Sequence, residues 1–432
     1  MMTKTLIDRI EGEASLYYEM RKGRVVHTEI AFPHVRGMER ILEGKKATDA
    51  LVITPRVCGI CGHAHLMAAV RAIESAYEAA GCPVTLTAKA ETIRELTLIL
   101  EMIQNHFKWL YLVILPALGS LGVPVPNTPL KGAYAAQQAT KILALFAGQW
   151  PHSSYMLPGG VTCEPTHLER VRAAGWLDEL VGFFEKEVAG MALERLLSFT
   201  TCSEFEGDGG DFRQLESGLK AAGMHEAGSG HVRFIVLGGH GFTVPSRLHQ
   251  TRPFRADSSR ISLERAVCSR EKSQAFNVRY DGRFYEVGPL ARGIASDTAL
   301  VKNLHRRYKD SAYTRIMARV YETAQLLERA RFLLRTLPLA EPSYVPPVPL
   351  GEITAQGEGI VEAPRGSLIH RLKVLQGRVE HYSIFTPTQW NLGSAAETDP
   401  SPSQKAMAGA AGIAEAIFIF RSFDVCSVCT TH

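Results

Sequence analysis

Apolar residues recur at three- and four-residue spacing along much of the chain, which is the pattern of amphipathic α-helices. From this pattern we predict helices over residues 65–80, 87–117, 131–146, 164–197 and 296–336. These segments exceed the mean of about 11 to 12 residues for helices of globular proteins. The pattern therefore predicts a core made of a bundle of long helices.

Strands are predicted in shorter regions. Alternating apolar and polar residues over 5–30 predict a β-hairpin that turns at Lys22 and Gly23. Segments 207–255 and 282–288 are rich in glycine and short alternating stretches, and residues 341–348 form a proline-rich crossing. No polar linker or internal repeat divides the chain. We therefore expect a mainly α fold with β additions (α+β), one domain over 1–432, with small peripheral antiparallel sheets around the bundle.

The composition of the 432 residues is that of a folded protein, with 46% hydrophobic and 21% charged residues. This balance excludes intrinsic disorder and low-complexity architecture. The formal net charge of +4 arises from 48 basic and 44 acidic side chains, which is a mild imbalance. We therefore expect no nucleic-acid partner.

The sequence predicts neither a membrane-spanning segment nor a secretory signal. No run of about 18 uncharged apolar residues occurs, so we expect no direct membrane span. The longest candidate, residues 109–123, is too short and follows Lys108. Acidic residues precede any apolar core at the N-terminus, so no secretory signal is predicted. We expect a cytoplasmic protein, with export beside a signal-bearing partner subunit as the alternative.

Eight cysteines are too few to staple a chain of this length with disulfides. Two pairs have C-x-x-C spacing, Cys58 with Cys61 and Cys426 with Cys429. The other four are expected to be buried small hydrophobic residues without chemistry: Cys82, Cys163, Cys202 and Cys268.

The two cysteine pairs are candidates for one metal site. A C-x-x-C turn places two thiolates on one side, and thiolates are soft ligands for zinc, copper(I), nickel and iron–sulfur centres. Zinc ribbons have shorter loops than the span from Cys58 to Cys429, where 429 minus 58 leaves 371. A redox dithiol usually lies near a βαβ pattern, which we do not find. From the residues alone, zinc, another soft metal and no metal all remain open.

The surrounding residues carry a resemblance to a known family. The stretch R-V-C-G-I-C-G-H-A-H at 56–65 and the stretch D-V-C-S-V-C-T-T-H at 424–432 resemble the paired signatures of nickel-iron hydrogenase large subunits. Six further segments are similar to family segments in the same order: R-I-E-G at 9–12, R-G-M-E at 36–39, L-P-G-G-V at 157–161, Y-E-V-G-P at 285–289, E-A-P-R-G at 362–366 and P-T-Q-W-N at 387–391. The resemblance therefore spans the chain from residue 9 to its last residue.

This resemblance implies an enzyme that splits H2 heterolytically into protons and electrons. The reaction is reversible, and H2 uptake is the expected physiological direction. It assigns all four thiolates, Cys58, Cys61, Cys426 and Cys429, to nickel. Cys61 and Cys429 also bridge to an iron that carries cyanide and carbon monoxide. The two cysteine motifs must then meet at one buried metal site, where the cofactor supplies the chemistry and the protein supplies geometry.

Two carboxylates gain roles from the resemblance. Glu11 alone reads as a solvated strand residue, but within R-I-E-G it matches the proton acceptor beside Cys426, where burial would raise its pKa. Glu39 alone reads as a surface charge, but the resemblance makes it a ligand of a second ion with His432 and the backbone carbonyl of Ile384. Magnesium is the implied ion, and iron is the alternative because histidine is an unusual magnesium ligand.

An arginine is implied above the metals. Arg365 reads as a salt-bridge partner on its own, but in E-A-P-R-G it resembles the arginine whose guanidinium hydrogen-bonds a cyanide, with Pro364 packed beside it. Thr388 is expected to donate to the other cyanide, and Asp424 to anchor Arg365. A planar fork of five donors suits this task better than lysine does.

Two further features concern histidines and a departure from the family. His65 has the family spacing and is expected to hydrogen-bond a sulfur, whereas His63 is expected at the surface. Where many members carry aspartate between two histidines, this chain reads Gln104-Asn105-His106, so Asn105 replaces one carboxylate above the metals.

The C-terminal sequence bears on subtype. The chain ends at the histidine of the second motif, so we expect either a form matured by cleavage or one made without an extension. The second case occurs among hydrogen-sensing members, which makes a low-turnover sensor the alternative function. His432 argues against energy-converting members, which usually carry arginine there.

Electrons need a route out of this chain. No further C-x-x-C remains for iron–sulfur clusters, and no Rossmann or P-loop glycine pattern occurs. We therefore expect a small subunit with iron–sulfur clusters as partner, in a heterodimer or a higher oligomer of heterodimers. A metal-free relative from the respiratory quinone-reducing complex is a third hypothesis, which retention of all four cysteines disfavours.

Overall fold

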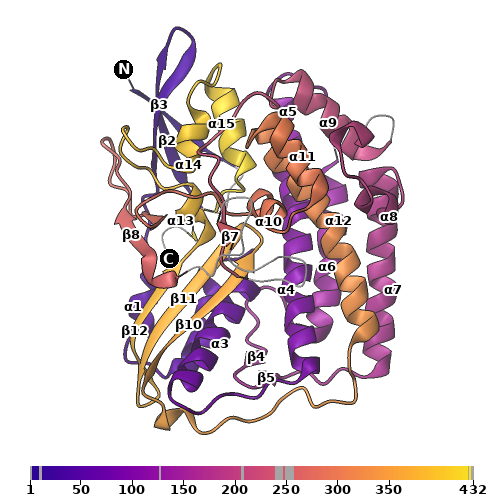
Figure 1. Cartoon of the computed structure of the whole chain (residues 1–432), viewed down its shortest axis with the longest axis vertical. Coiled ribbons are helices and arrows are strands. Elements are labelled where there is room, and N and C mark those ends of the chain that lie inside the picture. The colour runs from indigo at the N-terminus through magenta and orange to yellow at the C-terminus, as the bar shows by residue number, and fades with distance from the viewer. Residues whose placement is uncertain are drawn as a thin grey trace.

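The computed structural model describes residues 2–8, 12–125, 128–205, 209–238, 247–248, 257–426 and 428–429. Long helices stand side by side on one side of the molecule, and a three-stranded sheet with one long helix behind it forms the other side (Figure 1). The predicted site residues Glu11 and His432 lie outside the described residues.

The N-terminal strands form an antiparallel sheet in the order β1 (Met2–Ile7), β2 (Ala14–Arg21), β3 (Arg24–Ala31). The predicted hairpin is confirmed as β2 and β3, which turn at Lys22 (φ 50°) and Gly23 (φ 76°). Two left-handed residues match the twist of a tight hairpin. Strand β1 adds a third strand along β2, which the alternation pattern did not predict.

The first three predicted helices are confirmed with bounds close to the expected ones. They are α3 (Gly62–Ala79), α4 (Ala88–Lys108) and α6 (Pro129–Ala147). Helix α4 continues through a π-helical turn, η3 (Trp109–Ile114), into α5 (Leu115–Gly119), so the apolar run has one helical path with a local change of geometry.

The predicted helix 164–197 is divided. It comprises α7 (His167–Phe183), a π-helical turn η4 (Phe184–Ala189) and α8 (Leu193–Leu197). Gly190 adopts a left-handed conformation (φ 69°) after η4, and a left-handed residue is the usual end of a helix. The break therefore has a backbone cause that the apolar spacing does not reveal.

The predicted helix 296–336 is divided in the same way into α11 (Ala299–Tyr308) and α12 (Ala312–Thr336). Lys309 has φ 53°, and Ser311 then starts α12 because its hydroxyl accepts a hydrogen bond from the Thr314 amide at 3.2 Å. The serine cap marks a helix start that apolar spacing alone does not show.

The expectation of only short alternating stretches in 207–255 is wrong for part of that range. Helix α9 (Gly210–Ala221) occupies it, and Phe212, Leu215 and Leu219 are buried along one face. Glycines obscured this helical spacing in the sequence. Residues 207–208, 239–246 and 249–255 of this range lie outside the described residues.

A second antiparallel sheet has the order β10 (Ala355–Ala363), β11 (Gly366–Leu375), β12 (Arg378–Phe385). Its strands pack on α3, which carries the first cysteine pair at its start (Figure 1). The sheet therefore supports the candidate metal centre directly.

Glycines allow the close approach of β10 to α3. A Cβ at Gly357 would lie 2.0 Å from the Ala72 carbonyl oxygen, and a Cβ at Gly359 would lie 2.0 Å from the Ala68 carbonyl oxygen. The small alanines of the helix and the glycines of the strand thus bring two backbones into contact.

The remaining elements are short. They are α1 (Met38–Leu42), η1 (Ala47–Asp49), α2 (Ala50–Ile53), η2 (Thr54–Val57), β4 (Met156–Leu157), β5 (Gly160–Val161), η5 (Cys202–Phe205), β6 (Ile235–Val236), β7 (Arg247–Leu248), η6 (Ser258–Arg260), β8 (Ile261–Arg265), β9 (Phe276–Tyr280), α10 (Pro289–Ala295), η7 (Leu350–Glu352), α13 (Pro387–Asn391), α14 (Pro402–Met407) and α15 (Ile413–Ser422). The small antiparallel sheets and the helical core confirm the expected α+β class. The single-domain organisation over 1–432 stays a prediction.

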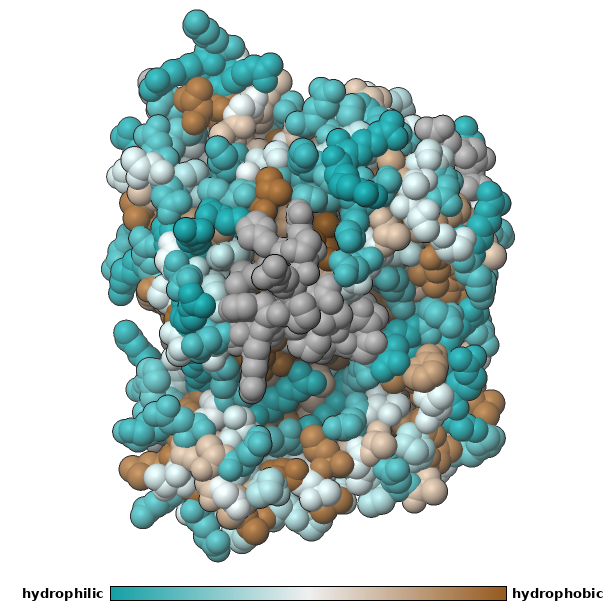
Figure 2. All heavy atoms as spheres, viewed as in Figure 1, coloured by the Kyte–Doolittle hydropathy of each residue, from teal (hydrophilic) through white to brown (hydrophobic). Residues whose placement is uncertain are grey.

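The surface and the longest apolar helix bear on membrane contact. The face shown in Figure 2 is mainly hydrophilic, with apolar residues scattered among polar ones. Among the described residues, one helical segment, Ala88–Gly119, is long and apolar enough to span a membrane, and 83% of its most apolar window is buried inside the protein. Burial of this kind is typical of a core helix.

Candidate metal centre

The first cysteine pair lies where η2 leads into α3. Cys58 follows η2, its sulfur accepts a hydrogen bond from the Ile60 amide at 3.4 Å, and Cys61 occupies the N-cap position of α3. Gly62 follows at a tight contact, because a Cβ there would lie 2.8 Å from the Pro55 carbonyl oxygen. The start of α3 is therefore packed so that both thiols point into the core.

The second pair follows α15 and meets the first. The sulfur of Cys58 lies 3.7 Å from that of Cys426, and the sulfur of Cys61 lies 3.5 Å from that of Cys429. The sulfurs of Cys426 and Cys429 are 3.1 Å apart. All four cysteines are buried and none forms a disulfide. The prediction that the two motifs meet in the interior is confirmed.

The sulfur positions suit a single ion or a compact cluster. The ligand atoms of Cys58, Cys61 and Cys429 all lie within 4.8 Å of one another. Metal–thiolate bonds of about 2.3 Å place sulfurs around one ion at comparable separations. The Cys426 sulfur borders this group of three, at 3.1 Å from Cys429 and 3.7 Å from Cys58.

Thiol ionisation in the metal-free chain is uneven. Burial raises the pKa of the Cys426 thiol well above its ordinary value. Burial opposes ionisation of Cys58 as well, but hydrogen bonds from the other three thiols hold the pKa of Cys58 well below its usual range. Four thiolates together in this dry environment require a cation, since a metal ion displaces thiol protons.

Two residues before Cys426, Asp424 joins two arginines. Its backbone is left-handed (φ 60°), its Oδ2 accepts a hydrogen bond from Arg319 Nη1 at 2.6 Å, and its backbone carbonyl accepts one from Arg365 Nε at 3.0 Å. With its amide nitrogen facing Asp424, Asn105 donates to Oδ2 at 3.0 Å and accepts from Arg365 Nη2 at 3.2 Å. The structure thus brings Arg365, Asp424 and Asn105 together, and it adds Arg319, which the sequence reasoning missed.

Two buried donors are candidates for contact with a bound group. Within the described part of the chain, Arg365 Nη1 and Thr388 Oγ1 are buried without a hydrogen-bond partner. A buried donor left unpaired costs about 1–3 kcal/mol, and a bound ion or ligand is one way to offset that cost. Arg365 lies in the turn between β10 and β11 beside buried Pro364, and Thr388 lies in α13. These orphan donors fit the small acceptor ligands expected on the iron.

The predicted second ion site is partly in view. Glu39 lies in α1, and its Oε1 accepts a hydrogen bond from the Ile384 amide nitrogen at 2.8 Å. The carboxylate and the backbone of Ile384 are therefore neighbours, as the resemblance requires. Ion binding through the Ile384 carbonyl and His432 stays a prediction.

Two histidines near the first pair are buried, and only one of them was expected at the surface. His65 is buried, and its Nδ1 lies 3.0 Å from His370 Nε2, so a bond to sulfur stays a prediction for the other ring nitrogen. The expectation of a surface position for His63 is wrong, because His63 is 1% exposed. Burial lowers the pKa of His63 to about 3, which keeps its ring neutral.

A buried acid beside this turn was also missed. Glu101, from α4, accepts hydrogen bonds from the amides of His63 at 2.8 Å and Ala64 at 3.0 Å, and from the Trp150 indole at 3.2 Å. Burial raises the pKa of Glu101 to about 8 although these hydrogen bonds favour ionisation. Glu101 thus caps α3 from a neighbouring helix, directly after the Cys58–Cys61 turn.

An arginine ties the two cysteine loops together. Arg36 donates to the backbone carbonyls of Arg56 at 3.1 Å and Val428 at 3.1 Å, and also to the carbonyl of Val57. One guanidinium therefore bridges both loops through their backbones. Arg36 belongs to the R-G-M-E segment quoted above, but its contact with the C-terminal loop gave no signal in the sequence.

The solitary cysteines are less uniform than expected. Cys202 is buried as predicted, whereas Cys82, Cys163 and Cys268 are only partly buried. The Cys202 sulfur accepts a hydrogen bond from Arg307 at 3.5 Å. These four thiols do not contribute to the sulfur cluster.

Comparison with known proteins identifies the class of this site. The family model "Nickel-dependent hydrogenase" matches residues 36–118 and 269–432. The chain belongs to the nickel-dependent hydrogenase family, whose members are oxidoreductases acting on H2. Both cysteine pairs fall within the matched ranges. Of the alternatives left open by the cysteine spacing, the family therefore favours a nickel site over a zinc site or a redox dithiol.

Similar proteins cover nearly the whole chain. The periplasmic NiFeSe hydrogenase large subunit of Desulfomicrobium baculatum is 26% identical over 89% of this chain and 84% of its own length. The coenzyme F420 hydrogenase subunit alpha of Methanothermobacter thermautotrophicus is 26% identical over 98% of this chain and 93% of its own. The structure of the Ni-Fe-Se hydrogenase from D. vulgaris Hildenborough in its as-isolated oxidized state superposes with a TM-score of 0.83 at 22% identity over both full chains. The fold is therefore that of a hydrogenase large subunit.

Proposed function

We propose that this chain is the catalytic large subunit of an uptake hydrogenase, which cleaves H2 heterolytically and passes the electrons to a partner subunit. The observation that carries the proposal is the meeting of four buried sulfurs from both cysteine motifs near Arg365, whose Nη1 has no hydrogen-bond partner within the described part of the chain. Cys58, Cys61, Cys426 and Cys429 would hold nickel, with Cys61 and Cys429 shared with iron. When bound, the nickel–iron group supplies the redox and H2-binding chemistry.

The residues of this chain would orient ligands and move a proton. Arg365 Nη1 and Thr388 Oγ1, both buried donors without a partner among the described residues, would donate hydrogen bonds to cyanide ligands of the iron. Asp424 holds the Arg365 guanidinium in place through its Nε. Glu11 would accept the proton that leaves by way of the Cys426 sulfur. A carboxylate in this role must have a pKa near the working pH.

A second ion would stabilise the C-terminal end of the site. Glu39, the Ile384 carbonyl and His432 form the proposed ligand set for magnesium, with iron as the alternative. Support comes from the 2.8 Å hydrogen bond that places the Glu39 carboxylate on the backbone of Ile384. Carboxylate and carbonyl oxygens are ligands that magnesium prefers, together with retained waters.

The partner and the location complete the proposal. We propose a small subunit with iron–sulfur clusters as the electron acceptor, because the cysteines outside the cluster are solitary and cannot hold one. The heterodimer could assemble into higher oligomers. We propose that the complex is in the cytoplasm. The alternative is export together with a signal-bearing small subunit, and cell fractionation would distinguish the two.

Metal content and turnover test this function. Nickel and iron should be present in the purified complex, with infrared bands of metal-bound carbon monoxide and cyanide. A Cys429→Ser variant should lose nickel and H2 oxidation, whereas Cys202→Ser, which removes a buried thiol outside the cluster, should keep both. Full activity of Cys429→Ser would refute the metal assignment. A loaded complex with very slow turnover would instead indicate the hydrogen sensor.

A further inference from the structure

The loop that carries Arg365 is held by another buried arginine. Ala363 lies opposite Gly366 in the pairing of β10 with β11, so the two residues between them form a two-residue hairpin loop, Pro364 and Arg365. Arg292, from α10, donates to the Ala363 carbonyl at 3.0 Å through Nη1 and to the Pro364 carbonyl at 3.2 Å through Nη2. Its side chain is 1% exposed. The Arg292 guanidinium therefore fixes the backbone directly before Arg365.

This loop needs support from outside the hairpin. The favoured two-residue hairpin turns require a positive φ at the first loop position. That position is Pro364, whose ring fixes φ at about −65°. The twist of the two strands therefore does not favour this loop, and contacts with other elements must stabilise it. The start of α10 also approaches closely, because a Cβ at Gly288 would lie 3.0 Å from the Arg365 carbonyl oxygen.

Two buried carboxylates hold Arg292 in this position. Glu322, from α12, accepts from Arg292 Nε at 2.6 Å and from Nη2 at 2.8 Å. Glu362, from β10, accepts from Nη1 at 3.1 Å. With the two loop carbonyls, Arg292 makes five hydrogen bonds, which matches the five N–H groups of a guanidinium. A lysine, with one nitrogen, cannot reproduce this set of bonds.

The Glu322 carboxylate also leads to a second buried arginine. His106 Nε2 lies 2.8 Å from Glu322 Oε2, and His106 Nδ1 lies 3.3 Å from Arg319 Nη1. An arginine only donates, so His106 Nδ1 is the acceptor and Nε2 carries the proton that bonds Glu322. Burial lowers the pKa of His106 to about 4, so its ring is neutral. Arg319 Nη1 also donates to Asp424 Oδ2 at 2.6 Å, which connects this chain of bonds to the metal centre.

The bonds close into a ring. The Asp424 backbone carbonyl accepts from Arg365 Nε at 3.0 Å, and Arg365 follows the Pro364 carbonyl that Arg292 holds. The ring and its branch contain three arginines and three carboxylates, all buried: Arg292, Arg319, Arg365, Glu322, Glu362 and Asp424. Such a balance suits the interior, where a charge without a partner is costly. Arg365 is thus held at its backbone and at its side chain by one connected set of bonds.

We propose that Arg292 is a positioning residue for Arg365, which fixes the loop before it directly and its guanidinium through the ring. Loss of the Arg292 guanidinium would free the loop, and it would leave Glu322 without the partner that holds it beside His106. This role belongs to the folded chain itself. The further step, in which Arg365 Nη1 meets a cyanide ligand of the iron, rests on the proposed function.

The full-length metal-free chain tests the positioning role without a measurement of activity. NMR of the arginine Nε–H groups should show slow exchange of the Arg365 proton with water, with its signal assigned through Arg365→Lys. Arg292→Lys should speed this exchange by about tenfold, the effect of weakening one hydrogen bond. Unchanged exchange in folded Arg292→Lys would overturn the proposal. A wild-type Arg365 that exchanges as fast as Arg21, whose side chain is 71% exposed, would overturn it even if the variant fails to fold.

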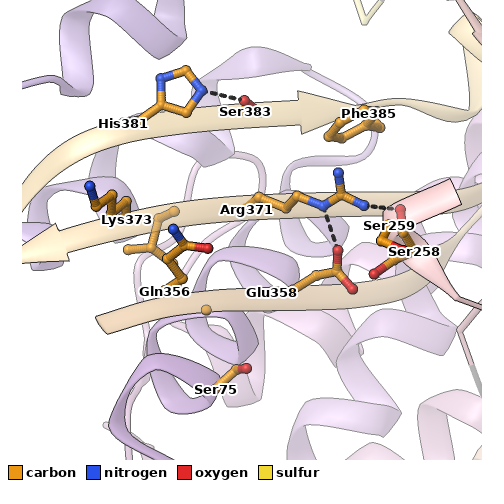
Figure 3. Close-up of a pocket in the computed structure, with 12 residues that line it drawn as sticks. Ser75, Ser258, Ser259, Gln356, Glu358, Arg371, Lys373, His381, Ser383 and Phe385 are labelled. Atoms are coloured by element: carbon orange, nitrogen blue, oxygen red, sulfur yellow. Dashed lines mark hydrogen bonds and ion pairs between the residues drawn. The ribbon is translucent and has the colours of Figure 1, made fainter. Parts of the chain in front are cut away.

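Two controls separate positioning from a general loss of stability. Arg94→Lys alters another buried arginine, which donates to the Glu74 carboxylate through both Nη nitrogens and to two backbone carbonyls. Arg371→Lys alters the hairpin of β10 and β11 itself, where Arg371 pairs with Glu358 beside a groove (Figure 3). Both variants should leave the exchange of the Arg365 proton unchanged. An equal increase in either control would overturn a specific role of Arg292.

The loaded complex tests the step toward the metals. Arg292→Lys should shift the infrared bands of metal-bound cyanide at wild-type nickel content, and it should lower H2 oxidation by about 10²-fold, as a small misplacement near the reaction does. Both control variants should keep the wild-type bands and rate. Unchanged bands and rate in Arg292→Lys would refute the step toward the iron ligands. Wild-type protein that binds no nickel, in which Arg292→Lys still speeds the exchange, would refute the proposed function alone.

Discussion

The sulfurs of Cys61 and Cys429 lie 3.5 Å apart in the protein interior although 368 positions separate them in the chain. A contact of such long range closes almost the whole polypeptide into one loop. Both partners are nearly inaccessible to solvent, so the contact cannot form until the helices around it have packed. Stability of the fold and occupation of the metal centre are therefore coupled.

Metal loading should stabilise the folded chain. A ligand that binds only the native state adds about 2.7 kcal/mol at a concentration 100 times its Kd. Differential scanning calorimetry of the nickel-loaded and metal-free forms should show a higher Tm for the loaded form. Cys58→Ser should remove this difference, whereas Cys163→Ser should preserve it because Cys163 is outside the cluster. Equal Tm values with and without metal in the wild type would contradict the coupling.

The contact between α3 and β10 should not tolerate a side chain at Gly359. A methyl group there would lie 2.0 Å from the Ala68 carbonyl oxygen, which is backbone and cannot move aside. Gly359→Ala should destabilise the protein by about 1–3 kcal/mol or more in urea unfolding. Gly351→Ala, which meets no atom within 4 Å, should change stability little.

Charge alone should not suffice at Arg365. Lysine keeps the positive charge but lacks the planar guanidinium. In Arg365 the guanidinium donates to the Asp424 carbonyl through Nε, while Nη1 can donate to a ligand. Arg365→Lys should retain nickel and lower the rate of H2 oxidation by about 10²-fold, the size typical of losing one preorganised donor. Arg329→Lys, at a partly exposed ion pair with Glu95, provides the control. Loss of nickel from Arg365→Lys would show a role in assembly instead.

Glu101 should make stability depend on pH. Its pKa is raised to about 8 in the folded chain by burial, against 4.5 as the ordinary value, so the folded state holds a proton that the unfolded state releases. The stability from this group is full below pH 4.5 and is lost as pH rises to about 8. Glu101→Gln cannot titrate, so the metal-free variant should gain on the wild type by a few kcal/mol over this range. Parallel pH profiles of the two proteins would contradict a raised pKa.

Proton exchange should depend on Glu11. General acid–base catalysis by one positioned carboxylate contributes about 10²–10⁴-fold. Glu11→Gln should therefore slow H/D exchange by at least 10²-fold at wild-type nickel content, while electron transfer in the loaded complex is preserved. Glu13→Gln, which alters a nearby exposed carboxylate, should behave like the wild type. An unchanged exchange rate in Glu11→Gln would exclude the proton role.

The hydrophobic pattern of the sequence predicts the long helices well and some of the strands poorly. Long apolar runs such as the one in α4 are unambiguous because a buried helix needs apolar residues on most faces. The strands β11 and β12 were missed although residues 366–385 alternate and Gln376-Gly377 forms a left-handed turn. The signal was present, but a buried sheet face carrying His370 reads as irregular.

Some residues of the candidate site could likewise be predicted from the sequence, and others could not. The cysteine pairs could be located from spacing, because C-x-x-C has few uses outside metal and redox sites. Glu101 could not, because it shares α4 with Glu91 and Glu95, and nothing in the sequence distinguishes the one carboxylate that is buried. Arg36 could not be linked to Val428, because that contact depends on how two loops meet in space.

The bridge that Arg36 makes between the two loops also imposes an order of events in the cell. A ribosome adding about 5–20 residues per second needs about 20–70 s to make the 368 positions between Cys61 and Cys429. During that interval the nascent chain offers two thiols and an arginine with no C-terminal loop to hold. A metal delivered then would meet only two of the four thiols, so we expect nickel to be inserted only after the C-terminal cysteine loop has been made.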